Sequence, residues 1–304
     1  MRLASLSLIP LLTVASALAQ ETHPAQGTSP FNATASFNEN YDNSSGYSSE
    51  LDGDVGMGFG NHFSLHTGAP FYLFQETQVA GSTTTSRVSG VGDAYVKLAF
   101  ENKGDLLHYT STLVGTLPSG DSSLGMSTGR ASGGWVNRFS HDFGAIEPFG
   151  EVGIGTGSAA LAAYLLGTKG RSQQLPFSSL GVQSVWRGGL GVPLGNKVDL
   201  EAGVYDILPF GNQKLYSKEI KSGSVGVSSG SQKGQHGRTW ELAHVVSGDA
   251  GIAADHGLMT DLNVSPSRHF EFDASFGRSL HYAVNTLSFT VSVHFGGGST
   301  PRAK

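Results

Sequence analysis

The last long segment of the chain, NTLSFTVSVHF at residues 285–295, alternates apolar and polar side chains without a break. Five apolar residues spaced two apart run from Leu287 to Phe295, and serine, threonine and histidine lie between them. Successive side chains of a β-strand point to opposite faces, so this pattern predicts a strand with one apolar and one polar face. The apolar face must then meet either a protein core or the hydrocarbon of a membrane.

The same alternation recurs along the chain and predicts an all-β protein. Phenylalanine, valine and leucine keep to one face of these segments, while most acids, amides and hydroxyls keep to the other. Besides the C-terminal segment, the alternating segments are 31–38, 50–59, 92–100, 181–192, 196–208 and 269–276.

Short and long connections alternate between the predicted strands. The short turns are 60–61, 102–105, 141–144 and 194–196, and the longer polar stretches lie around 75–87, 119–127, 157–181 and 210–237. Tight turns at one end and longer loops at the other are typical of bacterial outer-membrane barrels. Counting on this basis predicts about twelve strands, with both termini in the periplasm.

The strand count depends on residues 239–266. Residues 240–253 alternate well, and we take them as the strand. The following GLMTDLNVSPS, at 257–267, fits either a further short strand or a periplasmic turn. A further strand would place the two termini on opposite sides of the membrane, so we keep about twelve.

A soluble β-sandwich is the alternative architecture, because its strands also alternate. Many segments approach the ~9–11 residues that cross a tilted bilayer, whereas strands of globular proteins average about five or six. Charged residues make up 14% of the chain, against about 25% in soluble proteins. These features favour a transmembrane antiparallel up-and-down β-barrel, in which closure satisfies every backbone polar group. The apolar faces would then meet lipid, and the polar faces would look into the lumen.

The N-terminus has the features of a secretory signal peptide: Arg2, an apolar run to Leu18 and small residues at the cleavage site. A buried N-terminal helix is the alternative. The predicted organisation is a signal peptide at 1–19, an outer-membrane β-barrel at 20–295 and a polar tail at 296–304. The predicted location is therefore the outer membrane of a Gram-negative cell envelope.

Three motifs follow one another in the first half of the chain: GVGDAYVKLAF at 90–100, LPSGD at 117–121 and STGRASGGWVNRFS at 127–140. With EFDASFGRSL and the C-terminal segment, they resemble the outer-membrane channel family of the phenol meta-degradation pathway. Two departures are Ser119 in place of a threonine and Ser127-Thr128-Gly129 in place of Gly-Thr-Gly. The resemblance implies an outer-membrane channel for small molecules, hydrophobic or aromatic compounds among them. It carries over no catalytic or binding residues.

The face assigned to the lumen holds more acids than bases. A charged lumen sets ion preference, so this excess predicts a preference for cations. The alternative is a filled lumen in which the charges pair, with Arg130 and Arg187 as the expected partners of the acids. The candidate lumen-lining residues are Glu50, Asp52, Asp54, Asp93, Lys97, Arg130, Arg138, Glu147, Glu151, Arg187, Asp199, Glu201, Glu241, Glu271 and Asp273.

Two further patterns have competing interpretations. The alternate carboxylates of ELDGDVG, at 50–56, resemble a calcium loop but lack its glutamate at the twelfth position, so we predict no metal site. The apolar SAALAAYLLG, within 157–181, fits either a short helix in the barrel mouth or an extension of a strand.

The predicted function is passive transport of small molecules, and the predicted partners are the lipid bilayer of the outer membrane and a small solute. An enzyme would need a serine, a histidine and an orienting acid or amide brought together at the membrane boundary. We predict no enzyme and no cofactor. With a net charge of −5, the chain has no excess of basic residues that would predict binding to nucleic acid. The sequence does not predict the oligomeric state. The alternatives are a plugged structural or surface-interaction barrel, an outer-membrane enzyme and a soluble sandwich.

Overall fold

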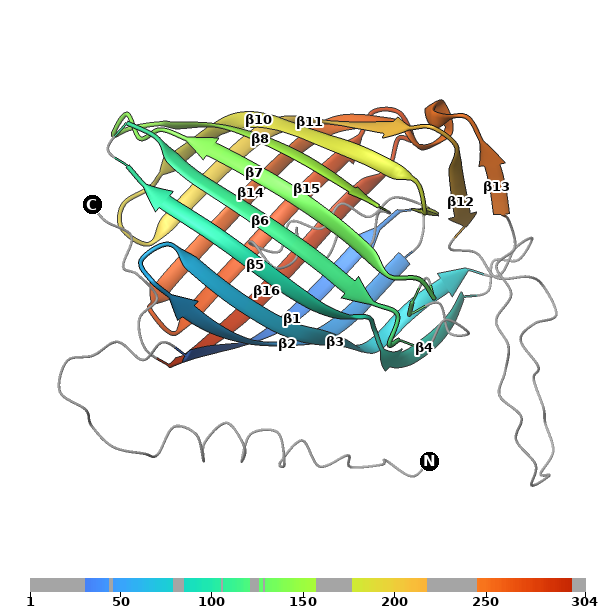
Figure 1. Ribbon diagram of the computed structural model, residues 1–304, viewed down its shortest axis with the longest axis horizontal. Helices are drawn as coiled ribbons and strands as arrows, with labels where there is room; N and C mark the ends of the chain where they lie inside the picture. Colours follow the sequence, from blue (N-terminus) through green and yellow to red (C-terminus); the bar gives the residue numbers. More distant parts are fainter. Residues whose placement is uncertain are drawn as a thin grey trace, which may run out of the picture.

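Twelve antiparallel strands close into a β-barrel (Figure 1). This computed structural model describes residues 31–43, 46–78, 85–104, 106–120, 126–127, 129–156, 177–217 and 245–296. Each strand pairs with the next one along the wall, and β1 pairs with β16 to complete the ring. The wall strands are β1 (Phe31–Asp42), β2 (Gly46–Phe59), β3 (Phe63–Gln78), β5 (Ala94–Lys103), β6 (His108–Leu117), β7 (Ser132–Ser140), β8 (Glu147–Thr156), β10 (Val182–Pro193), β11 (Val198–Phe210), β14 (Asp255–Ser267), β15 (Phe270–Ser279) and β16 (Asn285–Gly296).

The two ends of the barrel differ. Short turns join β2 to β3, β5 to β6, β7 to β8, β10 to β11 and β14 to β15 at one end, which we call the turn end. The opposite end, the loop end, carries the additional elements (Figure 1, right). These are β4 (Thr85–Val91), a small sheet of β9 (Phe177–Ser179), β12 (Gln213–Ser217) and β13 (Val245–Gly248), and the 3-10 helix η2 (Ala250–Ala253). β4 pairs with the outer part of β3 and continues into β5 after a break at Gly92 and Asp93.

The predicted number of strands is confirmed, but one predicted strand is wrong. The wall strand near the C-terminus is β14, which contains GLMTDLNVSPS, whereas residues 245–253 form β13 and η2 at the loop end. β14 pairs continuously with β11 from Asp255 to Val264. Pro266, near the end of β14, lies where the pairing with β15 shifts register. A proline is tolerated at such an irregularity because no ladder hydrogen bond is lost there.

In the C-terminal strand β16, the apolar face is the outer face of the barrel and the polar face is the inner one. Phe289 is 50% exposed on the outer surface, whereas its neighbour Thr290 is 5% exposed and points inward. Leu287 and Phe295 are exposed like Phe289, and Ser288 and Ser292 are buried like Thr290. The exposed apolar side chains continue around the wall as a belt that hydrocarbon can cover. Among the described residues, no helix has the length and apolar character needed to cross a bilayer.

An aromatic row marks the turn end of this belt. The rings of Phe59, Phe63, Phe100, Tyr109 and Phe139 follow one another across five strands, with centroids 5.0 to 6.0 Å apart. Aromatic girdles of this kind lie at the membrane interface in transmembrane barrels, where a ring meets both headgroups and acyl chains.

Candidate functional site: the interior of the barrel

Three predicted acids lie on one strand and point into the barrel. Glu50, Asp52 and Asp54 of β2 occupy alternate positions, and the outward Val55 beside them is 57% exposed. The ELDGDVG segment is therefore a wall strand. Within the described residues, no group of three or more metal-ligating side chains comes together.

Asp52 and Asp54 belong to a network that we call the β2 network, with His66 on β3 and with Tyr95 and Lys97 on β5. Asp54 lies 2.7 Å from Nδ1 of His66 and 3.4 Å from Nζ of Lys97. The hydroxyl of Tyr95 donates to Asp52 at 2.7 Å and to Asp54 at 3.3 Å. Because β3 separates β2 from β5, these contacts pass over the inner surface of β3.

Glycines make room for two such tyrosines. A Cβ on Gly68 would lie 2.5 Å from the hydroxyl of Tyr95, so the ring crosses β3 at a position that has no side chain. On the other side of the barrel, Tyr205 of β11 lies over Gly257 of the neighbouring β14. Its hydroxyl donates to Asp255, which is also on β14, at 2.9 Å. The glycines leave room for both rings: Tyr95 reaches a carboxylate on the strand beyond β3, and Tyr205 reaches one on β14 itself.

A second network, the arginine network, joins Arg138, Glu151, Arg187 and Glu201. Arg138 lies 3.0 Å from Glu201 and 4.0 Å from Glu151, and Arg187 lies 3.3 Å from Glu151. Arg138 on β7 reaches Glu201 on β11 past β8 and β10, so this pair spans the inside of the wall. The guanidinium also lies over the ring of Phe149, 4.2 Å from its centroid.

The two arginines expected to pair with the acids lie in different places. Arg130 is exposed in the connection before β7, whereas Arg187 pairs with Glu151 inside the barrel and Arg138 supplies a second inward guanidinium. β7 begins only at Ser132, and residues before the wall are not held on its inner face. The alternation of Arg138 with the outward Trp135 and Phe139 is the signal that places Arg138 on the inner face.

Asp93 also lies outside the strands, in the break between β4 and β5. Its carboxylate accepts the N–H of Gly120 at 3.0 Å, and the hydroxyl of Ser119 accepts the N–H of Ala94 at 2.8 Å. A Cβ on Gly120 would lie 2.8 Å from backbone atoms of Val91 and Gly92. The GVGD motif and residues 119–120 of the second motif therefore pack against each other at the loop end, beside the break between β4 and β5.

The remaining predicted residues lie on β8, β11 and β15, except for one. Glu147 and Asp199 lie near the turn end, where β8 and β11 begin. Asp273 accepts from Nδ2 of Asn263 at 2.6 Å, and Glu271 accepts from the same amide and lies 3.3 Å from Nε2 of His294. Glu241 lies outside the described residues, as do the signal peptide, the SAALAAYLLG segment and most of 210–237.

Polar uncharged side chains fill the inner face where the barrel closes. Thr290 of β16 donates to Asn38 of β1 at 2.8 Å, and Asn38 donates to Glu50 at 3.1 Å. Further along the same seam, the hydroxyls of Ser36 and Ser292 lie 2.9 Å apart. The first and last strands are thus joined by side-chain bonds as well as by the backbone ladder.

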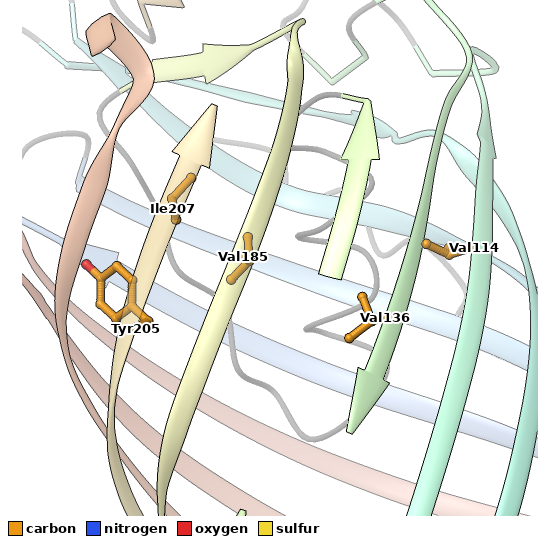
Figure 2. Close-up of a cluster of buried hydrophobic side chains, with 5 residues drawn as sticks. All are labelled: Val114, Val136, Val185, Tyr205 and Ile207. Carbon is orange, nitrogen blue, oxygen red and sulfur yellow. The ribbon is translucent and has the colours of Figure 1, made fainter. Parts of the chain in front are cut away.

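An apolar patch inside the barrel was not predicted from the sequence. Val114, Val136, Val185, Tyr205 and Ile207 form a buried cluster on the inner faces of β6, β7, β10 and β11 (Figure 2). Val136 and Val185 lie on either side of Gly153 of β8 in the register. Val136 and Val185 occupy positions that the alternation assigns to the lumen, where a polar residue is expected. Apolar residues at such positions were the signal in the sequence from which the patch could have been found.

One serine spacing resembles that of a hydrolase but lies in a different setting. The sequence has glycine at 125 and 129 with Ser127 between them, the spacing of a nucleophile elbow. That motif requires a strand-to-helix turn, whereas Ser127 lies in the connection between two wall strands, β6 and β7. Its hydroxyl accepts the N–H of Gly129 at 2.9 Å. This serine has a local turn contact instead of the setting of a nucleophile.

No protein-family model matches the chain, and a search of curated proteins finds no match. Among solved structures, an outer-membrane channel from Pseudomonas putida F1 is 12% identical with a TM-score of 0.53, over 90% of this chain and 100% of the channel. The porin NanC is 8% identical with a TM-score of 0.45, over 85% of this chain and 98% of that porin. A toluene transporter from Ralstonia pickettii, TbuX, is 7% identical with a TM-score of 0.42, over 90% of each chain.

The first likeness shows a shared fold: this chain is a transmembrane β-barrel of the outer-membrane type. At 12% identity it extends to architecture alone. The link to the phenol meta-degradation pathway stays a prediction.

Proposed function

We propose that the protein is a channel in the outer membrane of a Gram-negative bacterium, through which small molecules diffuse passively. The observation that carries this proposal is the division of the closed wall into an exposed apolar outer face and an inner face that holds most of the acids, amides and hydroxyls. Closure leaves no unpaired strand edge in the bilayer, and the inward polar face surrounds the path that a solute would take. The proposed export route uses the signal peptide at 1–19.

The proposed preference is for cations. Glu50, Asp52, Asp54, Glu271 and Asp273 support it, because they lie on strands that bring few bases to the interior. A wall with an excess of carboxylates raises the local concentration of cations and lowers that of anions.

Hydrophobic or aromatic compounds are the proposed solutes. Support comes from the resemblance of the 90–100 and 117–121 motifs to the phenol-pathway channels, and from the apolar patch inside the wall. We further propose that the barrel is not an enzyme.

A plugged structural barrel is the second candidate, and burial favours it. Val136 is 2% exposed although it points inward, and Asn38 and Ser288 on the opposite wall are also buried. A water-filled pore would leave such side chains in contact with solvent. If this conformation persists in the membrane, the loops at the loop end become the functional surface.

Single-channel recording on refolded protein in planar bilayers separates the two candidates. The channel proposal predicts discrete current steps and, under a potassium chloride gradient, a reversal potential of the sign set by cation preference. Insertion is checked on the same preparation by the change in gel migration between unheated and boiled samples. Current steps with anion preference would contradict the proposed role of the acids. Silence from protein that shows the heat-dependent shift would contradict the channel and favour the plugged barrel.

A further inference from the structure

One arginine faces the membrane from the loop end of the wall. Arg278 lies near the end of β15, on the outer face, and is exposed. The other arginines and lysines of the described wall strands either point inward or lie at the turn end, and they are Lys97, Arg138, Arg187 and Lys103. The cost of an arginine on the lipid face is large at the bilayer midplane and almost vanishes at the interface. Arg278 therefore marks the level of the lipid headgroups on β15.

The guanidinium of Arg278 is held in place without being neutralised. Its Nη1 donates to Oδ1 of Asn285 at 2.8 Å, and Asn285 is the register partner of Arg278 on β16. The amide carries no charge, and among the described residues no acid forms an ion pair with this arginine. A guanidinium has five N–H donors, so most of them stay available to a further acceptor.

Two histidines lie close to this arginine. His256 of β14 is its diagonal neighbour on the outer face, because Leu258 is the register partner of Arg278. The ring of His281, in the turn after β15, has its centroid 6.2 Å from that of His256. Both histidines are exposed, and an imidazole has at least one N–H to donate in either charge state. We call His256, Arg278, His281 and Asn285 the Arg278 patch.

One acid borders the patch. Asp206 of β11 is exposed and is the register partner of His256, so it lies one strand further from Arg278 than His256 does. Its carboxylate can accept hydrogen bonds from hydroxyl groups. The patch thus offers cationic and neutral donors in its middle and an acceptor at one edge.

An apolar surface lies directly below the patch on the same three strands. Leu258, Phe276 and Leu287 are 47%, 42% and 39% exposed. Each of them lies two residues toward the turn end from a member of the patch, on β14, β15 and β16 respectively. Polar and apolar groups therefore meet at a sharp boundary, which suits a lipid with an anionic headgroup above its acyl chains.

We propose that the Arg278 patch binds a phosphate group of lipopolysaccharide, the acylated and phosphorylated glycolipid of the outer leaflet. The longer loops of outer-membrane barrels lie outside the cell, so the loop end places the patch in that leaflet. The patch lies on the outer face of the wall, so it would bind the lipid equally in an open channel and in a plugged barrel.

Each part of this lipid gains from one part of the site. Arginine binds phosphate through charge-assisted, bidentate hydrogen bonds, and the acyl chains bury apolar area against the surface below. A phosphate monoester carries about −1.5 to −2 charges at neutral pH, more than the single charge of a phosphodiester. The patch should therefore favour the glycolipid over an anionic phospholipid. Inorganic phosphate gains only the contacts of the headgroup.

Native mass spectrometry of the refolded barrel in detergent counts the lipids that stay bound. The probes are lipid A with both of its phosphates, its monophosphorylated form and phosphatidylglycerol. We expect one lipid A per barrel at saturation, with an affinity about threefold or more above that of either other lipid. Inorganic phosphate in excess should leave it bound. Equal affinity for phosphatidylglycerol would overturn the glycolipid assignment, and displacement by inorganic phosphate would show a simple anion site instead of a lipid site.

A matched pair of variants assigns the binding to the patch. Arg278→Gln removes the charge and keeps a polar side chain, and Arg268→Gln makes the same change at an exposed arginine in the turn between β14 and β15, at the opposite end of the barrel. We expect R278Q to weaken lipid A binding about tenfold and R268Q to leave it unchanged. His256→Gln should have a smaller effect, about threefold. The heat-dependent gel shift confirms that each variant is folded. Unchanged binding in folded R278Q, or equal losses in R278Q and R268Q, would refute the proposal.

Discussion

The β2 network and the arginine network line the same barrel but balance their charges differently. The arginine network sets two guanidiniums against two carboxylates and encloses them. The β2 network sets one lysine and one histidine against two aspartates, and Glu50 lies on the same face of β2. The difference shows that inward carboxylates can have different roles. The acids of the arginine network, which are matched by guanidiniums, hold the wall together, whereas in the proposed channel the unmatched acids of β2 would set the charge that a solute meets.

The largest expected effect comes from breaking the arginine network. Arg187→Met leaves Glu151 buried with its closest guanidinium removed, and Arg138 is 4.0 Å away. Loss of one partner from a buried pair costs about 3–5 kcal/mol, so the free energy of unfolding should fall by that amount. Urea unfolding of the refolded barrel in detergent, followed by tryptophan fluorescence, measures it.

Arg278→Met is the matched control, because Arg278 is exposed and lies on the outer face of β15. Its expected cost is below about 1 kcal/mol. If both variants lost the same stability, the arginine network would have no special role in holding the wall.

The β2 network depends on the glycine over which Tyr95 passes. In Gly68→Ala the new Cβ would lie 2.5 Å from the tyrosine hydroxyl and 2.5 Å from the backbone oxygen of Gly53, so both the ring beside Asp52 and the β2 backbone must shift. We expect a loss of about 2–3 kcal/mol by the same unfolding measurement, in the range typical of overpacking. Gly53→Ala on the facing strand is the control, since its Cβ meets nothing within 4 Å. A neutral effect of G68A would contradict the tight packing of β3 against both Tyr95 and the β2 backbone at this position.

Charge changes in the β2 network should alter selectivity in opposite directions. Asp52→Asn removes a carboxylate that is in excess, and Lys97→Met removes the cation that partly offsets it. We expect the ratio of potassium to chloride permeability to fall about twofold in D52N and to rise by a similar factor in K97M. Reversal potentials in a salt gradient give both ratios. A change of the same sign in the two variants would show that conformation, and not charge, produced it.

The smallest effect belongs to an ion pair at the loop end. Arg87 lies 2.8 Å from Glu76, but the side chain of Arg87 is 67% exposed. Solvent screens such a pair, so Arg87→Ala should cost at most a few tenths of a kcal/mol. Unfolding in low and high salt checks this prediction, and a loss comparable to that of R187M would be inconsistent with it.

The wall was predictable because alternation encodes it directly. Phe289 and Thr290, or Val55 and Asp54, differ in burial as their positions in the pattern require. The segment of β14 was left out of the predicted wall because a further strand beside 240–253 would have put the termini on opposite sides of the membrane. Residues 245–253 do alternate, but they form only the short strand β13 and the 3-10 helix η2 at the loop end. The pairing with β11 decides that 255–267, and not 245–253, joins the wall, and a single sequence does not show which strands pair.

The interior was less predictable, since its contacts join strands that are far apart in the chain. The alternation places Arg138 on the inner face, but its contact with Glu201 depends on how β8 and β10 lie between them. The apolar patch was missed for the related reason that Val136 and Val185 form one surface only after the wall has curved. Local patterns reveal which face a residue occupies, whereas partners across the barrel follow from closure.

The central claim is that the apolar row of the C-terminal strand faces lipid and the polar row faces the interior. The chain has no cysteine, so single cysteines can be introduced from position 286 to 293 and spin-labelled without interference. In reconstituted vesicles, collision rates with oxygen, which concentrates in the bilayer, should be high at 287, 289, 291 and 293 and low at the positions between them. Collision rates with a water-soluble nickel complex should stay low at the odd positions. A period of two with the odd positions shielded from both reagents would contradict the account, because it would place the apolar face in a protein core.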